Sequence, residues 1–282
     1  MSLANNFMQV KLSISFFPIK KKDNELAREI TKNKNAQEGN IGADKLIIGK
    51  DFSEYYKIQG EIRNYFYDKT MPWEKRANYL LAVKLFDEFN NEMLDKIDKF
   101  NIAVDQFKSN YSLGLVQDDA KIRLTDAYKL SDYPDYNLIA DRFNIAVKYS
   151  PILNVDDIRF NINKEEEEKI RAIAKKEEEE KLQDAMDFLW NDKLYKPIKD
   201  IVKIFSKEDK TFHESTLEGI NDLVKYLESY NLNNDSKLDE IKSLIAQNLI
   251  NADSQELRDN KVYREKYANK AESVLKKIES YL

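Results

Sequence analysis

The longest hydrophobic pattern in the chain lies between Trp73 and Tyr111. Its positions follow each other at alternating steps of four and three, which is the spacing of a helix packed along a second helix. They are Tyr79, Val83, Phe86, Asn90, Met93, Ile97, Phe100, Val104, Phe107 and Tyr111. Pro72 precedes the pattern and fits the first turn of a helix, where its missing N–H costs nothing. The pattern predicts one helix over residues 73–110, roughly 55 Å long at 1.5 Å per residue.

Three short stretches instead alternate apolar and polar residues, which is typical of half-buried strands. Their apolar members are Val10, Leu12, Ile14 and Phe16; Phe143, Ile145, Val147 and Tyr149; and Ile158, Phe160 and Ile162. We expect a small antiparallel sheet in which the first strand pairs with the later two.

Helical spacing dominates the rest of the chain. A helix is predicted from Asp51 or Ser53 to about Thr70, ended by the proline that follows. From Lys164 the sequence KEEEEKIRAIAKKEEEEK predicts a charged helix, exposed in its first half and packed in its second. Its ion pairs at helical spacing are Glu165–Lys169, Glu167–Arg171 and Glu177–Lys181. Pro197 should kink or restart this helix, and a helical hairpin and a final helix from Ser254 should follow.

These elements predict a mainly α fold: a long-helix bundle with coiled-coil hairpins and a small antiparallel β-sheet. Two regions are expected, an N-terminal α+β domain over residues 1–163 and an all-helical region over residues 164–282. The long seam is covered either by the same chain or by a second copy, and the pattern alone leaves both open.

Composition narrows the function classes. Among 282 residues there is no cysteine, which excludes disulfides and thiolate chemistry, and the net charge of −5 argues against a nucleic-acid binder that uses its whole surface. No stretch approaches the 18 apolar residues of a membrane span, and the N-terminus lacks the pattern of a secretion signal. We expect a cytoplasmic protein without a membrane partner.

Candidate chemistry is sparse. The sequence contains none of the phosphate-binding glycine loops, nucleophile elbows or HExxH zinc motifs. His213 is the only histidine and is expected at the surface near a helix start. Paired carboxylates such as Asp118-Asp119 and Asp156-Asp157 lack calcium-loop spacing and are read as solvated faces or caps. We expect no enzyme, no catalytic residues, no cofactor and no metal.

A basic stretch with neighbouring tyrosines keeps one binding function open. Single-strand nucleic-acid binders combine a basic groove with aromatic rings on which bases stack. The residues that would form such a site are Lys20, Lys21, Lys22, Lys45, Lys50, Tyr55 and Tyr56. The competing interpretation places these tyrosines in the core and leaves the lysines to keep a strand edge soluble.

Ordered motifs across nearly the whole chain carry a family resemblance. They are VKLSISFF with KKK after it, KLIIGKD, TMPW, FKSNY, DYPDYNLIADRF, VKYSPI with DIRFNI, and TFHESTLEGINDLVKYLESYNLNNDSKL. In this order they resemble a family of uncharacterised bacteriophage and mobile-element proteins of unknown function. Genes of that family are often neighbours of a MoxR-type AAA+ ATPase and a von Willebrand factor A protein. The resemblance supplies no catalytic residues.

The resemblance implies a function through protein–protein interaction, as an adaptor or client of such an ATPase. A homo-oligomer is the other protein partner considered, and the charged helix from Lys164 is a candidate docking surface or a solvated spacer. The alternative function is single-stranded nucleic-acid binding in phage recombination or replication.

Overall fold

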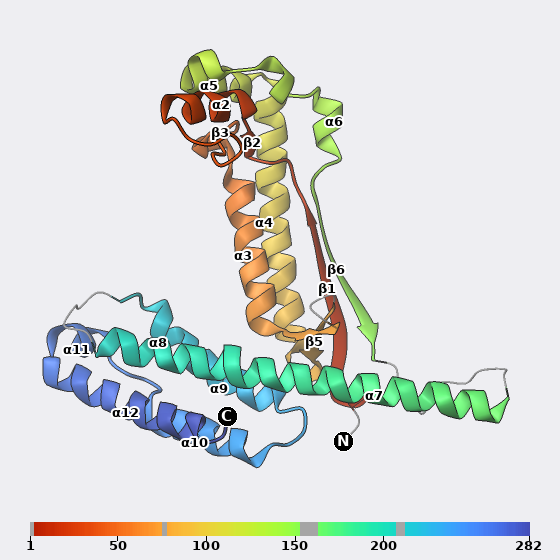
Figure 1. The fold of residues 1–282 in the computed structure, drawn as a ribbon, viewed down its shortest axis with the longest axis vertical. Coiled ribbons are helices and arrows are strands. Elements are labelled where there is room, and N and C mark those ends of the chain that lie inside the picture. Colours follow the sequence, from red (N-terminus) through yellow and green to blue (C-terminus); the bar gives the residue numbers. More distant parts are fainter. Residues whose placement is uncertain (1–2, 75–77, 153–162, 207–211) are drawn as a thin grey trace. The chain divides into compact units, whose positions relative to one another are not determined.

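The structure is a computed structural model that describes residues 3–74, 78–152, 163–206 and 212–282. It is mainly helical with a small antiparallel sheet, which confirms the predicted fold class (Figure 1). The chain forms two compact units. Unit 1 comprises Met1–Lys11, Lys69–Asp87 and Tyr149–Leu282, and unit 2 comprises Leu12–Asp68 and Glu88–Lys148. These units divide the chain differently from the predicted split after residue 163, because each is assembled from segments distant in sequence.

The sheet has the strand order β4-β5-β1-β6. Two of the three predicted strands are present, as β1 (Phe7–Ser15) and β6 (Asn144–Pro151), and their adjacency confirms the expected pairing of the first strand with the second. The other two strands are β4 (Met71–Trp73) and β5 (Asn78–Ala82). In register, Phe7 faces Ala82 in the pair β1–β5 and Met71 faces Leu80 in the pair β4–β5. The expected strand at Ile158, Phe160 and Ile162 lies outside the described residues.

The prediction of a single helix over 73–110 is wrong in its first third. Strands β4 and β5 and the short 3-10 turn η3 (Val83–Leu85) precede the long helix, which is α4 (Phe86–Ser112). Leu80, Leu81 and Ala82 are buried in consecutive positions of β5, a run that suits a strand covered on both faces. Pro72 lies in β4 at the edge of the sheet, where a missing N–H is tolerated.

From Phe86 onward the predicted seam is correct. The buried residues of α4 are Phe89, Met93, Phe100, Ala103, Val104, Phe107 and Tyr111. Helix α3 (Glu54–Lys69) lies alongside α4 in Figure 1, so the seam is covered by the same chain. Ring contacts join the two helices, including Tyr55 with Phe107 at 4.9 Å and Phe66 with Phe89 at 6.1 Å between centroids.

Short elements close the far end of this helix pair in unit 2. Gly114 adopts a left-handed φ of +78°, which glycine accepts without strain, and separates α4 from α5 (Leu115–Leu124). The remaining elements are β2 (Lys20–Lys22), α2 (Asn24–Asn33), β3 (Asp44–Leu46), η1 (Lys50–Phe52), η4 (Thr125–Ala127), η5 (Leu130–Asp132) and α6 (Tyr136–Ala140). Strands β2 and β3 form a separate two-stranded antiparallel sheet.

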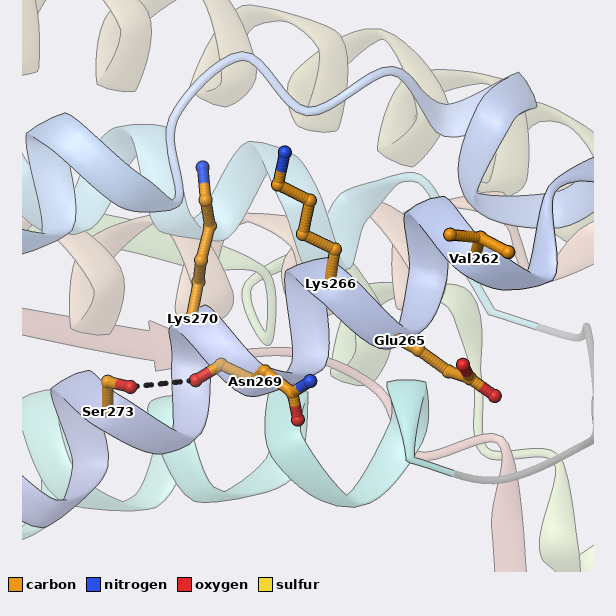
Figure 2. Close-up of a pocket in the computed structure, with 6 residues that line it drawn as sticks. All are labelled: Val262, Glu265, Lys266, Asn269, Lys270 and Ser273. Carbon is orange, nitrogen blue, oxygen red and sulfur yellow. Dashed lines mark hydrogen bonds between the residues drawn. The ribbon is translucent and has the colours of Figure 1, made fainter.

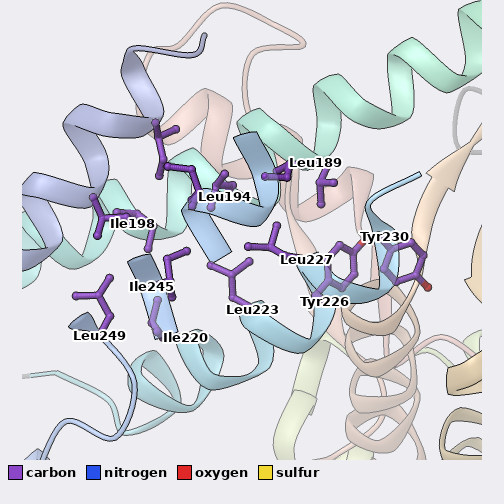
Figure 3. Close-up of a cluster of buried hydrophobic side chains, with 14 of the residues drawn as sticks. Leu189, Leu194, Ile198, Ile220, Leu223, Tyr226, Leu227, Tyr230, Ile245 and Leu249 are labelled. Atoms are coloured by element: carbon purple, nitrogen blue, oxygen red, sulfur yellow. The ribbon is translucent and has the colours of Figure 1, made fainter. Parts of the chain in front are cut away.

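Unit 1 contains α1 (Leu3–Asn6) and a helical core. Its helices are α7 (Lys164–Phe188), α8 (Lys196–Phe205), α9 (Ser215–Tyr230), α10 (Ser236–Asn248), α11 (Ser254–Asp259) and α12 (Lys261–Glu279). Figure 3 shows the apolar side chains of this core converging from several helices, among them Leu194, Leu227 and Ile245. Each of these three side chains is at most 1% exposed.

The expected change of helix at Pro197 takes the form of a π-helical segment, η7 (Leu189–Tyr195), between α7 and α8. A proline cannot donate to the carbonyl four residues earlier, and its ring crowds that carbonyl. The wider π turn just before Pro197 accommodates the proline ring without interrupting the helix that runs from α7 into α8.

The final helix does not run unbroken from Ser254 as predicted. Asn260 is extended, with φ −110° and ψ 103°, and separates α11 from α12. Its side chain accepts the backbone N–H of Tyr263 at 3.1 Å and so caps α12.

Two tyrosines of α9 anchor the β4–β5 region within unit 1. The hydroxyl of Tyr226 donates a hydrogen bond to the carbonyl of Thr70 at 3.0 Å. The hydroxyl of Tyr230 lies within hydrogen-bond distance of two carbonyls, those of Lys69 at 2.7 Å and Leu80 at 3.1 Å. The rings stack with centroids 4.4 Å apart. Burial raises the pKa of Tyr230, so the hydroxyl stays protonated as a donor.

Candidate functional site

The first half of α7 lacks a buried face. Residues 164–181 include no buried side chain, whereas Ala185 and Met186 are packed into the core, as predicted for the two halves. In Figure 1 this half extends past the other helices of unit 1. A helix without an apolar packed face needs other stabilisation.

Local contacts supply that stabilisation. Asn163 caps the helix by accepting the N–H of Glu166 at 2.9 Å. The ion pairs along the helix are Glu165–Lys169 at 2.7 Å, Glu167–Arg171 at 2.7 Å and Lys176–Glu180 at 3.8 Å. The first two were predicted. The predicted pair of Glu177 with Lys181 is replaced, because Lys181 reaches Glu74 at 2.9 Å.

A pocket of about 300 Å³ adjoins the second half of α7 within unit 1. It brings the end of β4 against α7 and η7, and we call it the Trp73 pocket. Its lining residues are Pro72, Trp73, Glu74, Lys181, Asp184, Asp187, Phe188, Asn191 and Asp192. It combines an aromatic wall with four carboxylates and one ammonium group.

Two backbone irregularities border this pocket. Glu74 has a positive φ of +50°, a conformation that costs a residue with a side chain on the order of 1 kcal/mol. The π-helix η7 contributes Asn191 and Asp192 to the lining, and π-helical segments are found frequently at functional sites.

The electrostatics of the Trp73 pocket favour a cation. Its one ammonium, Lys181, is already paired with Glu74, and that hydrogen bond is the main reason why the pKa of Glu74 is lowered. Asp192 is paired with Lys196, and Asp187 accepts the side-chain amide of Gln183 at 2.8 Å. Among the described residues, Asp184 and Asp187 are therefore the lining carboxylates without a cation partner. Within the described residues no cluster of three or more metal-ligating side chains exists. Carboxylates beside an apolar wall can pair with an ammonium or guanidinium group.

Sequence reasoning missed this pocket. Pro72 and Trp73 were assigned to a helix start, and their contact with α7 depends on segments more than a hundred residues apart. The one available signal was the excess of carboxylates from Asp184 to Asp192, which could not be told from an ordinary solvated face.

The proposed nucleic-acid residues are only partly available. Lys20, Lys21 and Lys22 are exposed on β2, Lys50 is exposed in η1, and Tyr56 is 40% exposed. The other two are internal. Tyr55 is fully buried and donates to the carbonyl of Phe17 at 2.9 Å, and Lys45 is 5% exposed. A base cannot stack on the ring of Tyr55, nor a phosphate reach Lys45, in this conformation.

Lys45 is instead the centre of a buried ionic cluster in unit 2. Its ammonium lies 2.6 Å from a carboxylate oxygen of Asp132 and 3.2 Å from one of Asp23, and it donates a hydrogen bond to the carbonyl of Ala127 at 3.1 Å. Lys21 adds a second ion pair to Asp132 at 2.7 Å. Asp23 also caps α2 by accepting the N–H groups of Glu25 and Leu26.

The pKa shifts follow from this geometry. The N–H of Leu26 and the ammonium of Lys45 lower the pKa of Asp23. Burial alone would raise the pKa of Asp132, but the hydrogen bonds from Lys21 and Lys45 outweigh it and lower the pKa. Burial would also lower the pKa of Lys45, and its hydrogen bonds to Asp132 and Asp23 raise it instead.

Acid should therefore destabilise unit 2. A carboxylate with a lowered folded-state pKa contributes stability above its unfolded value of about 3.9, and this contribution is lost as the pH falls through the folded value. We expect the unfolding free energy to fall below about pH 4, with a shallower fall in Lys45→Met, which lacks the cation. Urea unfolding followed at several pH values by far-UV circular dichroism checks this, and parallel pH profiles of the two proteins would contradict it.

The other residues singled out from the sequence have ordinary environments. His213 is exposed just before α9, and its carbonyl accepts the N–H of Thr216 at 2.9 Å. Asp118 and Asp119 form ion pairs with Lys121 and Arg123 on their own helix. Asp156 and Asp157 lie outside the described residues.

A further depression, of about 420 Å³, lies on α12. Figure 2 shows all six of its lining residues on this one helix, with Lys266 and Lys270 extending side by side. The hydroxyl of Ser273 bonds the backbone carbonyl of Asn269 at 2.9 Å. Because no second element contributes a lining group, this is an open helix surface and not a converging site.

Comparisons with known proteins return no match: no protein-family model matches the chain, and no curated protein or solved structure is significantly similar to it. Among the described residues, no helix combines the length and the apolar character required to cross a membrane.

Proposed function

We propose that this chain is a non-enzymatic phage or mobile-element protein that acts by binding another protein in the host cytoplasm. The observation that carries the proposal is the solvent-exposed first half of α7, a regular helix held by its own ion pairs and continuous with the Trp73 pocket. An exposed helix of this kind presents side chains that a protein partner can contact, without bringing reactive groups together.

The identity of the partner rests on the motif resemblance described above. It implies a MoxR-type AAA+ ATPase, with this chain as adaptor or client. The seam of α4 is covered by α3, which removes one reason to invoke a homo-oligomer.

Co-purification tests this proposal. The tagged full chain is expressed with the AAA+ ATPase encoded beside it, and the complex is isolated at low and at physiological salt. We expect the ATPase to be retained at both, with more at low salt because exposed charge pairs are screened by ions. Repeated absence of the ATPase at both salt concentrations would contradict the ATPase partnership.

Single-stranded nucleic-acid binding is the alternative. The exposed row Lys20–Lys22 with Tyr56 favours it, while the burial of Lys45 and Tyr55 reduces the proposed set. Fluorescence anisotropy with a labelled oligonucleotide at low salt is the direct measurement, because the phosphate term is strongest there. A flat titration would eliminate this function.

A further inference from the structure

One face of α7 is exposed along nearly its whole length. Its residues follow each other at steps of four, three, four, three and four, so they lie on one stripe of the helix. The α7 stripe consists of Glu166, Ile170, Ile173, Glu177, Glu180 and Asp184, and each of these residues is exposed. The spacing is that of a helix–helix seam, yet no helix of the described chain covers it.

The two isoleucines give the stripe an apolar contact point. Ile170 is 39% exposed and Ile173 is 60% exposed, one helical turn apart. Single exposed apolar side chains are ordinary. Two of them at seam spacing on an otherwise charged helix can pack between the side chains of a partner helix.

The rest of the stripe is acidic and ends at the Trp73 pocket. Asp184 belongs to both, so the stripe leads from the isoleucine pair over Glu177 and Glu180 to the pocket. At 1.5 Å per residue, roughly 20 Å separate Ile170 from Asp184. A ligand complementary to this surface has an apolar end, basic residues at seam spacing, and one cation that reaches the pocket.

Resting on the proposed function, we propose that the α7 stripe binds an amphipathic basic helix of the protein partner. The partner's apolar residues pack on Ile170 and Ile173, and its Lys or Arg side chains face the carboxylates. One of these side chains, best an arginine, enters the Trp73 pocket, where its guanidinium pairs with the carboxylate of Asp184.

A second copy is a poorer occupant of the stripe. Antiparallel pairing centred on the isoleucines places Glu166 of one copy against Glu177 of the other, and parallel pairing in register places each stripe glutamate against its own counterpart. Like charges facing each other are unfavourable, so charge complementarity selects a basic partner.

A helical peptide probe tests the inference on the full chain. The probe is a fluorescein-labelled peptide of about 21 residues, enough for three heptads, with two leucines at seam spacing followed by arginines on the same face. Two control peptides carry glutamate for arginine, or serine for leucine. Trp190→Phe serves as the background, because it leaves Trp73 as the single tryptophan and its fluorescence reports on the pocket.

The chain offers a matched pair of charge-reversal variants. Glu166→Lys/Glu177→Lys alters the stripe, and Glu168→Lys/Glu179→Lys alters exposed positions on another face with the same spacing and the same change in net charge. Circular dichroism confirms that both retain their helix content. A third variant, Ile170→Ser/Ile173→Ser, removes the apolar contact alone.

We expect the arginine–leucine peptide to bind at about 50 mM salt, to weaken steeply as salt rises, and to change the Trp73 emission. The stripe variant should weaken binding by roughly tenfold or more, which is about 1.4 kcal/mol, and the matched control by less than about twofold. The isoleucine variant and both control peptides should also bind more weakly.

Other results overturn the inference. No anisotropy change, or equal weakening by both charge variants, shows that the stripe is not a specific site. Binding without a change in Trp73 emission removes the pocket from the interface. Concentration-dependent dimerisation in sedimentation, lost only in the stripe variant, shows that the occupant is a second copy.

Failure of this inference is distinguishable from failure of the proposed function. If the ATPase co-purifies equally with the wild type and with the stripe variant, the protein-binding function stands and the stripe is not its surface. If the basic peptide binds the stripe specifically but the ATPase never co-purifies, the stripe stands and the ATPase is the wrong partner.

Discussion

Replacing Lys45 with methionine should lower the unfolding free energy of unit 2 by on the order of 3 kcal/mol. The substitution keeps most of the side-chain volume but removes the ammonium between Asp23 and Asp132. Asp132 would keep only Lys21 as its ion-pair partner, and the carbonyl of Ala127 would lose its donor. Breaking a buried pair from one side is costly because the remaining charge stays desolvated.

Hydrogen exchange of peptides from α2, α3 and α4 measures the effect in unit 2, and tryptophan fluorescence reports separately on unit 1, which holds both Trp73 and Trp190. Lys22→Met is the matched control, because Lys22 is exposed on β2; it should change stability by less than about 0.5 kcal/mol. Adding Asp23→Asn and Asp132→Asn to Lys45→Met should restore part of the lost unfolding free energy, because it removes the buried carboxylate charges that Lys45 no longer neutralises. Equal effects of the two lysine substitutions would show that the cluster is not a stabilising feature.

Phe107→Ala should be at least as damaging, with an expected loss of about 3–5 kcal/mol. The Phe107 ring is 2% exposed, and its centroid lies 4.9 Å from that of Tyr55, 5.6 Å from Phe143 and 5.7 Å from Tyr111. Truncation leaves a cavity among rings that are themselves held in place, since Tyr55 and Tyr111 donate their hydroxyls to backbone carbonyls. The surroundings therefore have little freedom to collapse into the space.

The control for this substitution lies on the same helix. Ile102 is 68% exposed, so Ile102→Ala removes apolar atoms without opening a cavity and should cost less than about 0.5 kcal/mol. Phe107→Leu should fall between the two, because it refills part of the volume. Urea unfolding followed by far-UV circular dichroism ranks the three variants. A Phe107→Ala protein as stable as Ile102→Ala would show that the aromatic cluster is not tightly packed.

Elements with a long, local hydrophobic pattern could be predicted from the amino-acid sequence alone. The four-three pattern from Phe86 to Tyr111 specifies one helical face, because each pair of turns places apolar residues on the same side of the helix. The alternation in β1 and β6 and the ion pairs of α7 are likewise local, and all three elements are present. The mainly α fold with a small sheet follows from these signals.

Elements with short patterns, and sites built from distant segments, depend on tertiary contacts that the sequence pattern does not reveal. Residues 71–85 are compatible with both helical and strand spacing, and pairing with β1 selects the strands. Tyr55 and Lys45 looked like surface ligands, but the ring is enclosed by Phe107 and Phe143, and the ammonium by carboxylates at positions 23 and 132. The Trp73 pocket exists only where β4 meets α7. The physical reason is the same in each case: burial and pairing are set by partners far away along the chain, and periodicity within one segment carries no information about them.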